Sequence, residues 1–591
     1  MSIFSGGVLS GGTRADMPAG GVKEEGSVSS GGSSSGEAGA PSGGNNAGGG
    51  GSAASAGESS ADGNADSPGT TMDVNTEGGS ASTDVGGDAT SVDAGAAGVD
   101  GSAASTGIQP DGAFATICPS LFETNTGAPP GVAPLPSPEQ ASYQHTELTA
   151  MLTFSLATFN GSEPGAPVEE EATAFAPTNL TQDTVNAWVS ELKTAGFRQA
   201  MLTVKQYVGF CLWPSKLTND CNQFSVAESG WAEGRSGGDL VKMWTDAMRY
   251  ADMRVGIYLS PWDQHYPSSS NGYQTYMENQ LIELLTDYGP VYQVELDGAN
   301  ATEATVDWSG FFTLARKLQP HVLIWAGPEV SQMAAAANPP NFPDVQWIGN
   351  QVGQASRTTS SLNLSNCAAT SDGTIVGEDL WCPYEAPVSD RLTEWFWTPE
   401  ATPMTLREMQ SIYFTSVGMN STLLFGVPPS TTGAFDPKDA TLLQEFGTWY
   451  ASLYANNTLK GQPAVADSTW ETAGFDGSKA VDEDICTYWA AAGGKTTGRL
   501  EVDPPSSITF SVISIREPIE LGERSTGYHV EIKQNGAWST PKDSSGNEVR
   551  GTVIGQRQLW QLSTTTADAI ALVVDSARGV PAISEFGAYH P

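Results

Sequence analysis

The run Val291-Tyr-Gln-Val-Glu-Leu-Asp-Gly-Ala-Asn300 joins an apolar-rich stretch to a carboxylate, Asp297, at the point where the stretch ends. Such a run predicts a short buried strand followed by a loop. In barrels of alternating strands and helices, catalytic groups lie at the carboxyl ends of the strands. Asp297 is therefore the first candidate for a catalytic residue.

Strand-like and helix-like segments alternate on both sides of this run. The expected strands cover residues 148–159, 199–208, 254–263, 292–300, 322–329, 345–350 and 421–427. Amphipathic helices are expected between them at residues 181–195, 239–251, 273–287, 310–318 and 405–417. This alternation predicts an α/β fold, a (β/α)₈ TIM-like barrel over residues 113–460.

The sequence changes character on either side of the expected barrel. Residues 1–112 are mostly Gly, Ser, Ala and Asp, a composition that cannot bury a core, and we expect a disordered acidic tether there. This tether resembles the spacer of secreted bacterial surface proteins. From 461 to 591, five β-type segments separated by turns predict an antiparallel β-sandwich: residues 500–502, 508–513, 527–533, 559–562 and 569–574.

Motifs at the expected strand ends follow one another in a recognisable order. They are Thr203-Val-Lys-Gln-Tyr-Val-Gly-Phe-Cys-Leu-Trp-Pro-Ser-Lys216, Gly256-Ile-Tyr-Leu-Ser-Pro-Trp-Asp263, Leu296-Asp-Gly-Ala-Asn300, Trp347-Ile-Gly-Asn350 and Trp381-Cys-Pro-Tyr-Glu385. Over about residues 143–459 the chain resembles glycoside hydrolase family 29, the α-L-fucosidases. The resemblance implies a retaining double displacement with Asp297 as the nucleophile and a glutamic acid as the proton donor. That chemistry needs two carboxyl groups roughly 5–5.5 Å apart.

Five positions depart from the family's pattern. Gln351 stands where the family has its general acid, and an amide cannot release a proton at neutral pH. Glu295 replaces a tryptophan two residues before Asp297. The remaining departures are Thr153 for a histidine, Glu163-Pro164-Gly165 for Glu-Trp-Gly, and Gln206, Tyr207 and Val208 for His-His-Asp. Thr153, Gln206 and Tyr207 either still bind a sugar through hydrogen bonds or fill a pocket that has lost this role.

Other polar and aromatic residues near the strand ends have two interpretations each. Glu295 and Glu329 are the nearest candidate proton donors by sequence, or else glutamates on the surface or in local hydrogen bonds. His265 reaches a pocket mouth or belongs to a solvated loop. Five tryptophans either stack on sugar rings or pack between barrel and loops: Trp213, Trp262, Trp347, Trp381 and Trp395.

The C-terminal region resembles a discoidin-like, galactose-binding-like module at residues 474–489, 515–524 and 576–581. The resemblance implies a module that can bind sugars and sometimes calcium. Asp476, Asp482 and Asp484 either supply oxygen ligands to such an ion or form an acidic turn.

Composition restricts the partners. The net charge is −40, so no basic patch is expected to track nucleic acid, and no apolar run is long enough to span a membrane. Six cysteines permit local disulfides, Cys211 with Cys221 and Cys367 with Cys382, or remain free thiols. No zinc, phosphate-loop or dinucleotide motif is present, so we expect no metal and no cofactor.

Two functions from different classes follow. The first is an exo-acting α-L-fucosidase that uses Asp297 and a non-standard proton donor on fucosylated glycans. The second is a catalytically impaired family member that binds carbohydrate at a surface, or a glycosidase for another sugar. Either protein is expected outside a bacterial cell or on its surface. The first ten residues lack signal-peptide features, so we expect the true start upstream or a signal missing from this sequence.

Overall fold

A computed structural model describes residues 116–123, 127–161, 171–218, 221, 223–267, 269–298, 306–377, 379–392 and 394–591. The expected tether at residues 1–112 and the Glu163-Pro164-Gly165 motif lie outside these ranges. Among the described helices, none has the length and apolar character needed to cross a membrane.

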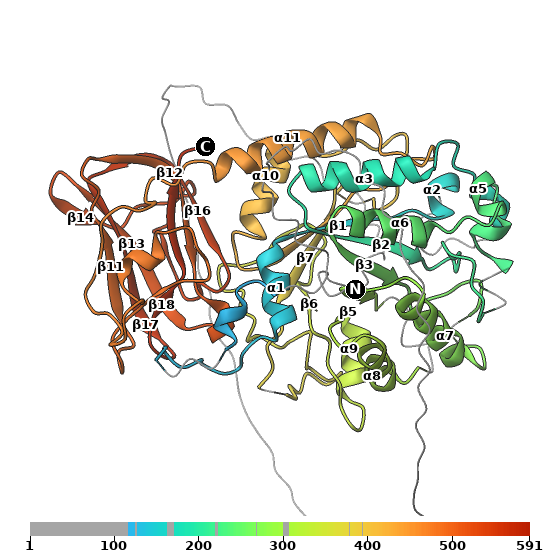
Figure 1. The fold of residues 1–591 in the computed structure, drawn as a ribbon, viewed down its shortest axis with the longest axis horizontal. Helices are drawn as coiled ribbons and strands as arrows, with labels where there is room; N and C mark the ends of the chain where they lie inside the picture. Colours follow the sequence, from blue (N-terminus) through green and yellow to red (C-terminus); the bar gives the residue numbers. More distant parts are fainter. Residues whose placement is uncertain are drawn as a thin grey trace, which may run out of the picture. The chain divides into compact units, whose positions relative to one another are not determined.

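Eight parallel strands form the barrel (Figure 1). They are β1 (Leu148–Leu152), β2 (Gln199–Lys205), β3 (Arg254–Leu259), β4 (Gln293–Leu296), β5 (Leu323–Ala326), β6 (Gln346–Trp347), β7 (Tyr384–Ser389) and β8 (Thr422–Gly426). The strand order is β5-β4-β3-β2-β1-β8-β7-β6. A parallel bridge between Trp325 and Val345 lies at the seam between β5 and β6. The expected (β/α)₈ barrel is therefore confirmed.

The helices of the barrel lie outside the strands (Figure 1). They are α1 (Pro138–Thr146), α2 (Ala157–Asn160), α3 (Gln182–Thr194), α5 (Ala232–Arg235), α6 (Leu240–Tyr250), α7 (Tyr273–Thr286), α8 (Trp308–Leu318), α9 (Pro328–Ala335), α10 (Leu406–Thr415) and α11 (Pro437–Leu453). All five expected helices are present, as α3, α6, α7, α8 and α10. Helices α1, α2, α5, α9 and α11 were not among those expected.

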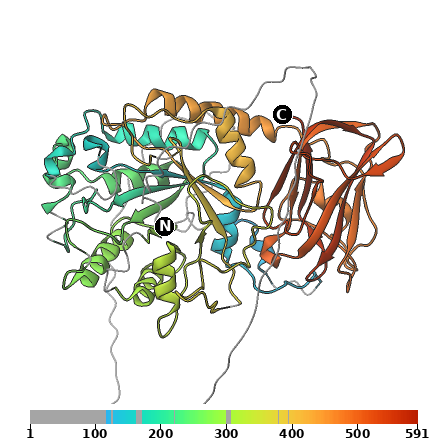
Figure 2. The same cartoon turned by 180° about the vertical axis from the view of Figure 1, so that it is seen from behind.

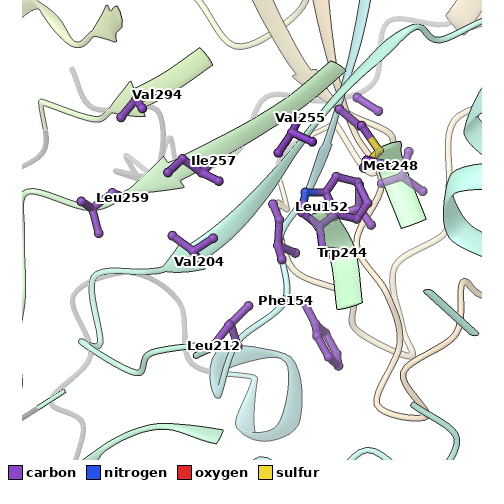
Figure 3. Packing of buried hydrophobic residues seen from close by; sticks show 14 of the residues in the cluster. Leu152, Phe154, Val204, Leu212, Trp244, Met248, Val255, Ile257, Leu259 and Val294 are labelled. Carbon is purple, nitrogen blue, oxygen red and sulfur yellow. The ribbon is translucent and has the colours of Figure 1, made fainter. Parts of the chain in front are cut away.

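Alternation along each strand divides its side chains between two cores. One set points outward against the helices, and Figure 3 shows Leu152, Val255 and Ile257 with Trp244 and Met248 of α6 in this buried cluster. The other set fills the inside of the barrel with large side chains: Met151, Met201, Tyr258, Trp325, Trp347, Trp395 and Leu424. On β4, Val294 and Leu296 belong to the outward cluster. Glu295 therefore points into the barrel.

The C-terminal region forms an antiparallel β-sandwich, which confirms the second expected architecture (Figures 1 and 2). One sheet has the order β16-β12-β19 and the other β14-β13-β17-β11-β9. The strands are β9 (Ala464–Ala466), β10 (Trp489–Ala490), β11 (Gly498–Val502), β12 (Ile508–Arg516), β13 (Ser525–Gln534), β14 (Ala537–Ser539), β15 (Arg550–Gly551), β16 (Gln558–Ala567), β17 (Ala569–Ala577), β18 (Ala582–Ile583) and β19 (Glu585–Tyr589). Trp489, Leu500 and Phe510 contribute to a core of its own.

Several expected strand boundaries were wrong. The strand expected at 148–159 ends at Leu152, and residues Ala157–Asn160 form α2. The strand expected at 322–329 ends at Ala326, because Pro328 begins α9 and proline favours the first turn of a helix. Strand β7 was not expected at all, since Pro387 interrupts its sequence and proline is rare within sheets.

All six cysteines form disulfides. The expected pairs Cys211–Cys221 and Cys367–Cys382 are confirmed. The third bond joins Cys118, before the barrel, to Cys486 in the sandwich, across 368 residues of sequence. It ties the start of the described chain to the sandwich.

A buried ionic cluster centred on Glu147 also joins barrel and sandwich. The Glu147 carboxylate, directly after α1, accepts hydrogen bonds from Arg557 Nε at 2.6 Å, from Gln556 Nε2 at 2.8 Å and from Arg516. The hydroxyl of Tyr413 on α10 lies 3.2 Å from the same carboxylate. Burial alone raises the pKa of Glu147, but the charges of Arg557 and Arg516 outweigh this effect and lower the pKa to about 2.

Candidate active site

Asp297 follows the last residue of β4 and is 1% exposed. The hydroxyl of Tyr258, on the neighbouring strand β3, donates a hydrogen bond to Asp297 Oδ2 at 3.1 Å. The residue thus lies at the carboxyl end of a barrel strand, where the sequence predicted it. A donor on the carboxylate fixes its direction and lowers the cost of burying it.

The backbone beside Asp297 is packed closely against the end of β5. A Cβ atom on Gly327 would fall 2.2 Å from the backbone nitrogen of Gly298. A Cβ on Gly298 would in turn fall 2.2 Å from Glu329 Oε2, so the Glu329 carboxyl group reaches the residue that follows Asp297. Glu329 belongs to the first turn of α9 and is half-buried. It is the expected donor candidate that the structure brings beside the Asp297 backbone.

Gln351 belongs to a group of residues around Trp395. The indole Nε1 of Trp395 donates to Gln351 Oε1 at 3.4 Å, and the Trp395 carbonyl accepts a hydrogen bond from Thr153. Trp347 Nε1 donates to the carbonyl of Asn350 at 3.0 Å. Trp347 and Trp395 pack in the same interior cluster as Tyr258. The structure therefore gathers four of the expected site residues, which come from three separate strand ends.

Gln206 and Tyr207 lie after β2, Trp262 lies after β3, and Tyr207 contacts both of the others. Gln206 Oε1 accepts a hydrogen bond from the backbone nitrogen of Tyr207 at 2.6 Å. The rings of Tyr207 and Trp262 stack with centroids 5.5 Å apart. Because all barrel strands are parallel, these residues share the end of the barrel at which Asp297 lies.

A buried ion pair fixes the loop that carries Trp262. Lys205 Nζ lies 3.0 Å from Asp263 Oδ2, and both side chains are fully buried. Tyr276 of α7 donates to the same oxygen at 3.0 Å, while Asp263 Oδ1 accepts from the backbone nitrogen of His265. Lys205 and Asp263 lie in two of the strand-end motifs but were given no role. Their complementary charges at two adjacent strand ends were the available signal.

The remaining aromatic candidates have packing roles. Trp213 Nε1 donates to Glu283 Oε2 at 3.1 Å, and Trp381 Nε1 donates to Gln144 Oε1 at 2.8 Å. Both indoles are buried. The exposed His265 stacks its ring on Phe224 with centroids 4.2 Å apart.

Two glutamates lie inside the barrel near Asp297. Glu295 and Glu385 are both 0% exposed, and the hydroxyl of Tyr143 donates to Glu385 Oε2 at 2.6 Å. Burial first, then the charges of Glu385 and Asp297, raise the pKa of Glu295 well above its usual value. Burial raises the pKa of Glu385 to about 7, against the opposing effect of its hydrogen bonds. Glu385 lies in the motif at residues 381–385 but was given no role, because β7 was not predicted.

The acidic turn of the sandwich is held by its own hydrogen bonds. Asp476 Oδ1 accepts from the backbone nitrogen of Ser478 at 3.0 Å, at the start of the short 3₁₀ helix Gly477–Ala480. Within the described ranges, no three His, Cys, Asp or Glu side chains are arranged to hold a metal ion.

A (β/α)₈ barrel that presents an aspartate at a strand end, with aromatic side chains around it, is an architecture of glycoside hydrolases. The family model of alpha-L-fucosidase matches residues 169–453. Alpha-L-fucosidase 1 of Arabidopsis thaliana is 32% identical over 474 residues, which cover 78% of this chain and 88% of the relative. The chain belongs to the α-L-fucosidase family, glycoside hydrolase family 29, with a C-terminal β-sandwich module.

Solved structures agree with this assignment. The Ruminococcus gnavus GH29 fucosidase in complex with fucose is 28% identical, with a TM-score of 0.68, and the match covers 80% of this chain and 98% of that one. SpGH29 is 29% identical, with a TM-score of 0.67 and coverage of 78% and 99%.

Proposed function

We propose that this chain hydrolyses terminal α-L-fucosyl residues with retention of configuration and that Asp297 is the nucleophile. The observation that carries the proposal is the position of Asp297, directly after β4 and hydrogen-bonded to Tyr258, in a member of the fucosidase family. The Asp297 carboxylate attacks the anomeric carbon as the leaving group departs. Water then cleaves the resulting fucosyl ester.

In this proposal the fucose pocket lies over Asp297 and uses aromatic faces. Trp262, Trp347 and Trp395 supply rings that can cover the apolar side of a sugar. Support for their orientation comes from the hydrogen bond of Thr153 to the Trp395 carbonyl and from the stacking of Tyr207 on Trp262. Gln206, beside Tyr207, has an amide that suits sugar hydroxyls, whereas Glu295 is fully buried beneath Asp297 and acts on the sugar only through that residue.

The proton for the leaving group cannot come from Gln351, because its side chain is an amide. The contact with Trp395 lets Gln351 orient a glycosidic oxygen without protonating it. Fucosides whose leaving group departs without protonation are therefore hydrolysed faster than fucosides whose leaving group is another sugar. Glu329 is the half-buried carboxyl group beside Gly298, and its replacement by glutamine tests whether it assists.

The test compares 4-nitrophenyl α-L-fucoside with a fucosyl-oligosaccharide. The wild type should release nitrophenol, and Asp297→Asn should reduce the release to the background rate on both substrates. Glu329→Gln should lower the rate on the oligosaccharide more than on the aryl fucoside if Glu329 donates the proton. Equal rates for the wild type and Asp297→Asn would contradict the proposal.

A second candidate function is carbohydrate binding without turnover, or turnover of another sugar. The amide of Gln351 favours it, since the family's acid is missing at that position. Calorimetric titration with L-fucose distinguishes the alternatives. Binding without hydrolysis of either fucoside supports a binding protein, whereas no binding of fucose points to another sugar.

We also propose that the protein is exported to the extracellular space or the surface of a bacterium. Three disulfides support export, because such bonds persist in oxidising compartments. We propose the boundaries 1–112 for the tether, 113–460 for the barrel and 461–591 for a discoidin-like module. The buried cluster that the sandwich has of its own supports the second boundary.

A further inference from the structure

Glu295 and Glu385 are two acids within the barrel interior that the proposed reaction does not use directly. Glu295 projects from β4, where its register partners are Tyr258 on β3 and Trp325 on β5. Glu385 projects from β7, where its register partner on β6 is Trp347. Register partners on parallel strands point to the same face, so each carboxyl group lies beside large aromatic side chains.

Hydrogen-bond donors reach one of these acids and not the other. Tyr143 and Gln293 donate to Glu385 Oε2, at 2.6 and 3.4 Å. Within the described ranges, neither carboxyl oxygen of Glu295 has a hydrogen-bond partner. Glu385 Oε1 also has none in the described part of the chain. Burying an ionised carboxylate that accepts no hydrogen bond costs the folded state much free energy, whereas burying the protonated acid costs much less.

No cation compensates the pair among the described residues, since neither glutamate forms an ion pair with a lysine, arginine or histidine. The buried Lys205 is paired with Asp263. Arg254, at the start of β3, donates to Thr146 Oγ1 at 2.6 Å. The titratable groups that face the two glutamates are Tyr143 of α1, Tyr258 of β3 and Asp297 after β4.

Glu147 provides an internal comparison. It is also a buried glutamate, but Arg516 and Arg557 hold it as an anion, and its pKa falls to about 2. Glu295 has the same side chain and the same burial without an arginine, and its pKa moves in the opposite direction. The difference follows from the partners of each carboxyl group and not from burial alone.

We propose that Glu295 and Glu385 form a carboxyl pair that keeps at least one proton in the folded barrel at neutral pH. Glu295 then acts on the reaction as a positioning residue, because a neutral Glu295 leaves Asp297 to react as the anion beside it. This second part rests on the proposed function. Glu295 is fully buried beneath Asp297, so the proposal excludes it as the donor to a leaving group.

The proposal predicts how stability depends on pH. Both folded-state pKa values lie above the usual value of 4.5. Between that value and the folded pKa, the folded state binds more protons than the unfolded state, so the contribution to stability is complete below about pH 4.5 and is lost as pH rises. Between about pH 4.5 and the folded-state pKa, each proton that the pair releases on unfolding makes the unfolding equilibrium constant rise about tenfold per pH unit.

The test measures unfolding by urea between pH 5 and 8 for the wild type, Glu295→Gln, Glu385→Gln and Glu278→Gln. Glu278 on α7 is a partly exposed glutamate outside the barrel interior and serves as the control. The interior variants should each flatten the rise of the unfolding constant with pH, while Glu278→Gln should follow the wild type. Identical pH dependence in the wild type and both interior variants would overturn the proposal.

The reaction is tested with kcat/KM for 4-nitrophenyl α-L-fucoside over the same pH range. Glu295→Gln cannot ionise and should move the fall of kcat/KM on the aryl fucoside to higher pH, whereas replacement of a proton donor would lower the rate on a fucosyl-oligosaccharide and leave the rate on the aryl fucoside nearly unchanged. The latter result would overturn the positioning role. If no variant, wild type included, hydrolyses either fucoside, the proposed function fails and the positioning role fails with it. The urea measurements then still decide whether the pair holds its proton.

Discussion

In the proposed reaction, Gln351 is the residue that most directly limits the rate. An amide that accepts a hydrogen bond from Trp395 can hold a glycosidic oxygen in place but has no acidic proton to give. Departure of a sugar alkoxide without protonation is slow, while departure of nitrophenolate is not. Under this proposal, the substrate range of the chain depends on how basic the leaving group is.

Replacing Gln351 with glutamate should restore a general acid. We expect the rate on a fucosyl-oligosaccharide to rise by up to about 10²–10⁴-fold, because general acid catalysis contributes on this scale. The rate on 4-nitrophenyl α-L-fucoside should change much less. Initial rates on the two substrates measure the effect, with Asp297→Asn/Gln351→Glu as the inactive control. An unchanged rate on the oligosaccharide would show that Gln351 does not occupy the donor position.

At the scale of elements, the ends of β4 and β5 determine where Asp297 lies. Gly298 and Gly327 let the two backbones meet, and an added Cβ has different consequences at each position. At Gly298 the obstacle is the flexible end of Glu329, which can move away. At Gly327 the obstacle is the backbone nitrogen of Gly298, which cannot move without moving Asp297.

Gly327→Ala should therefore reduce kcat on the aryl fucoside more than Gly298→Ala does. A displacement of about 1 Å at a reacting group can cost on the order of 10²-fold in rate. Stopped assays of both variants, with thermal unfolding as a check on folding, measure the difference. Greater damage from Gly298→Ala would mean that Glu329, and not the backbone contact, holds this end of the site.

Much of the barrel could be predicted from its elements. Apolar-rich runs identified seven of the strands, and amphipathic periodicity identified α3, α6, α7, α8 and α10. Strand ends were extended too far, because apolar loop residues such as Phe154 and Leu156 pack in the core and look like strand. Strand β7 was missed because its proline argues against a strand unless tertiary contacts override it.

The candidate site was predictable in part. Asp297 was identified because a carboxylate that ends a buried strand is visible in the sequence. The pairing of Glu295 with Glu385 was not, because it depends on two strands that lie across the barrel from each other. Lys205 and Asp263 were given no role although their opposite charges at the ends of two adjacent strands were a usable signal, because the sequence does not show that the two side chains are buried together.

At the scale of the whole molecule, barrel and sandwich are joined by contacts that no local sequence pattern reveals. The disulfide between Cys118 and Cys486 spans 368 residues, and the Glu147 cluster takes its arginines from β12 and from Arg557, just before β16. Both features make the stability of the barrel depend on the sandwich.

Glu147→Gln should destabilise the protein by about 3–5 kcal/mol, because it leaves Arg516 and Arg557 buried without their acid. The pKa of Glu147 is lowered to about 2 from a usual 4.5. The ionised Glu147 carboxylate therefore contributes to the stability of the folded state above about pH 4.5, and this contribution is lost as pH falls toward 2. Urea unfolding at pH 7 and pH 3 measures both effects.

The control for this prediction is Asp287→Asn, which breaks the exposed pair of Lys216 and Asp287 and should change stability little. The difference in the free energy of unfolding between wild type and Glu147→Gln should be smaller at pH 3 than at pH 7. A difference in the free energy of unfolding that is the same at pH 7 and pH 3 would contradict the ionised state assigned to Glu147.

Covalent capture of the nucleophile tests the central claim most directly. A 2-deoxy-2-fluoro-α-L-fucosyl fluoride carries a leaving group that needs no general acid, so the missing acid at Gln351 does not prevent reaction, and the slow second step lets the ester accumulate. Mass spectrometry of the digested protein should locate the fluorofucosyl group on the peptide that contains Asp297, and the group should be absent from Asp297→Asn. Attachment to another residue, or hydrolysis of the aryl fucoside that persists in Asp297→Asn, would contradict the account.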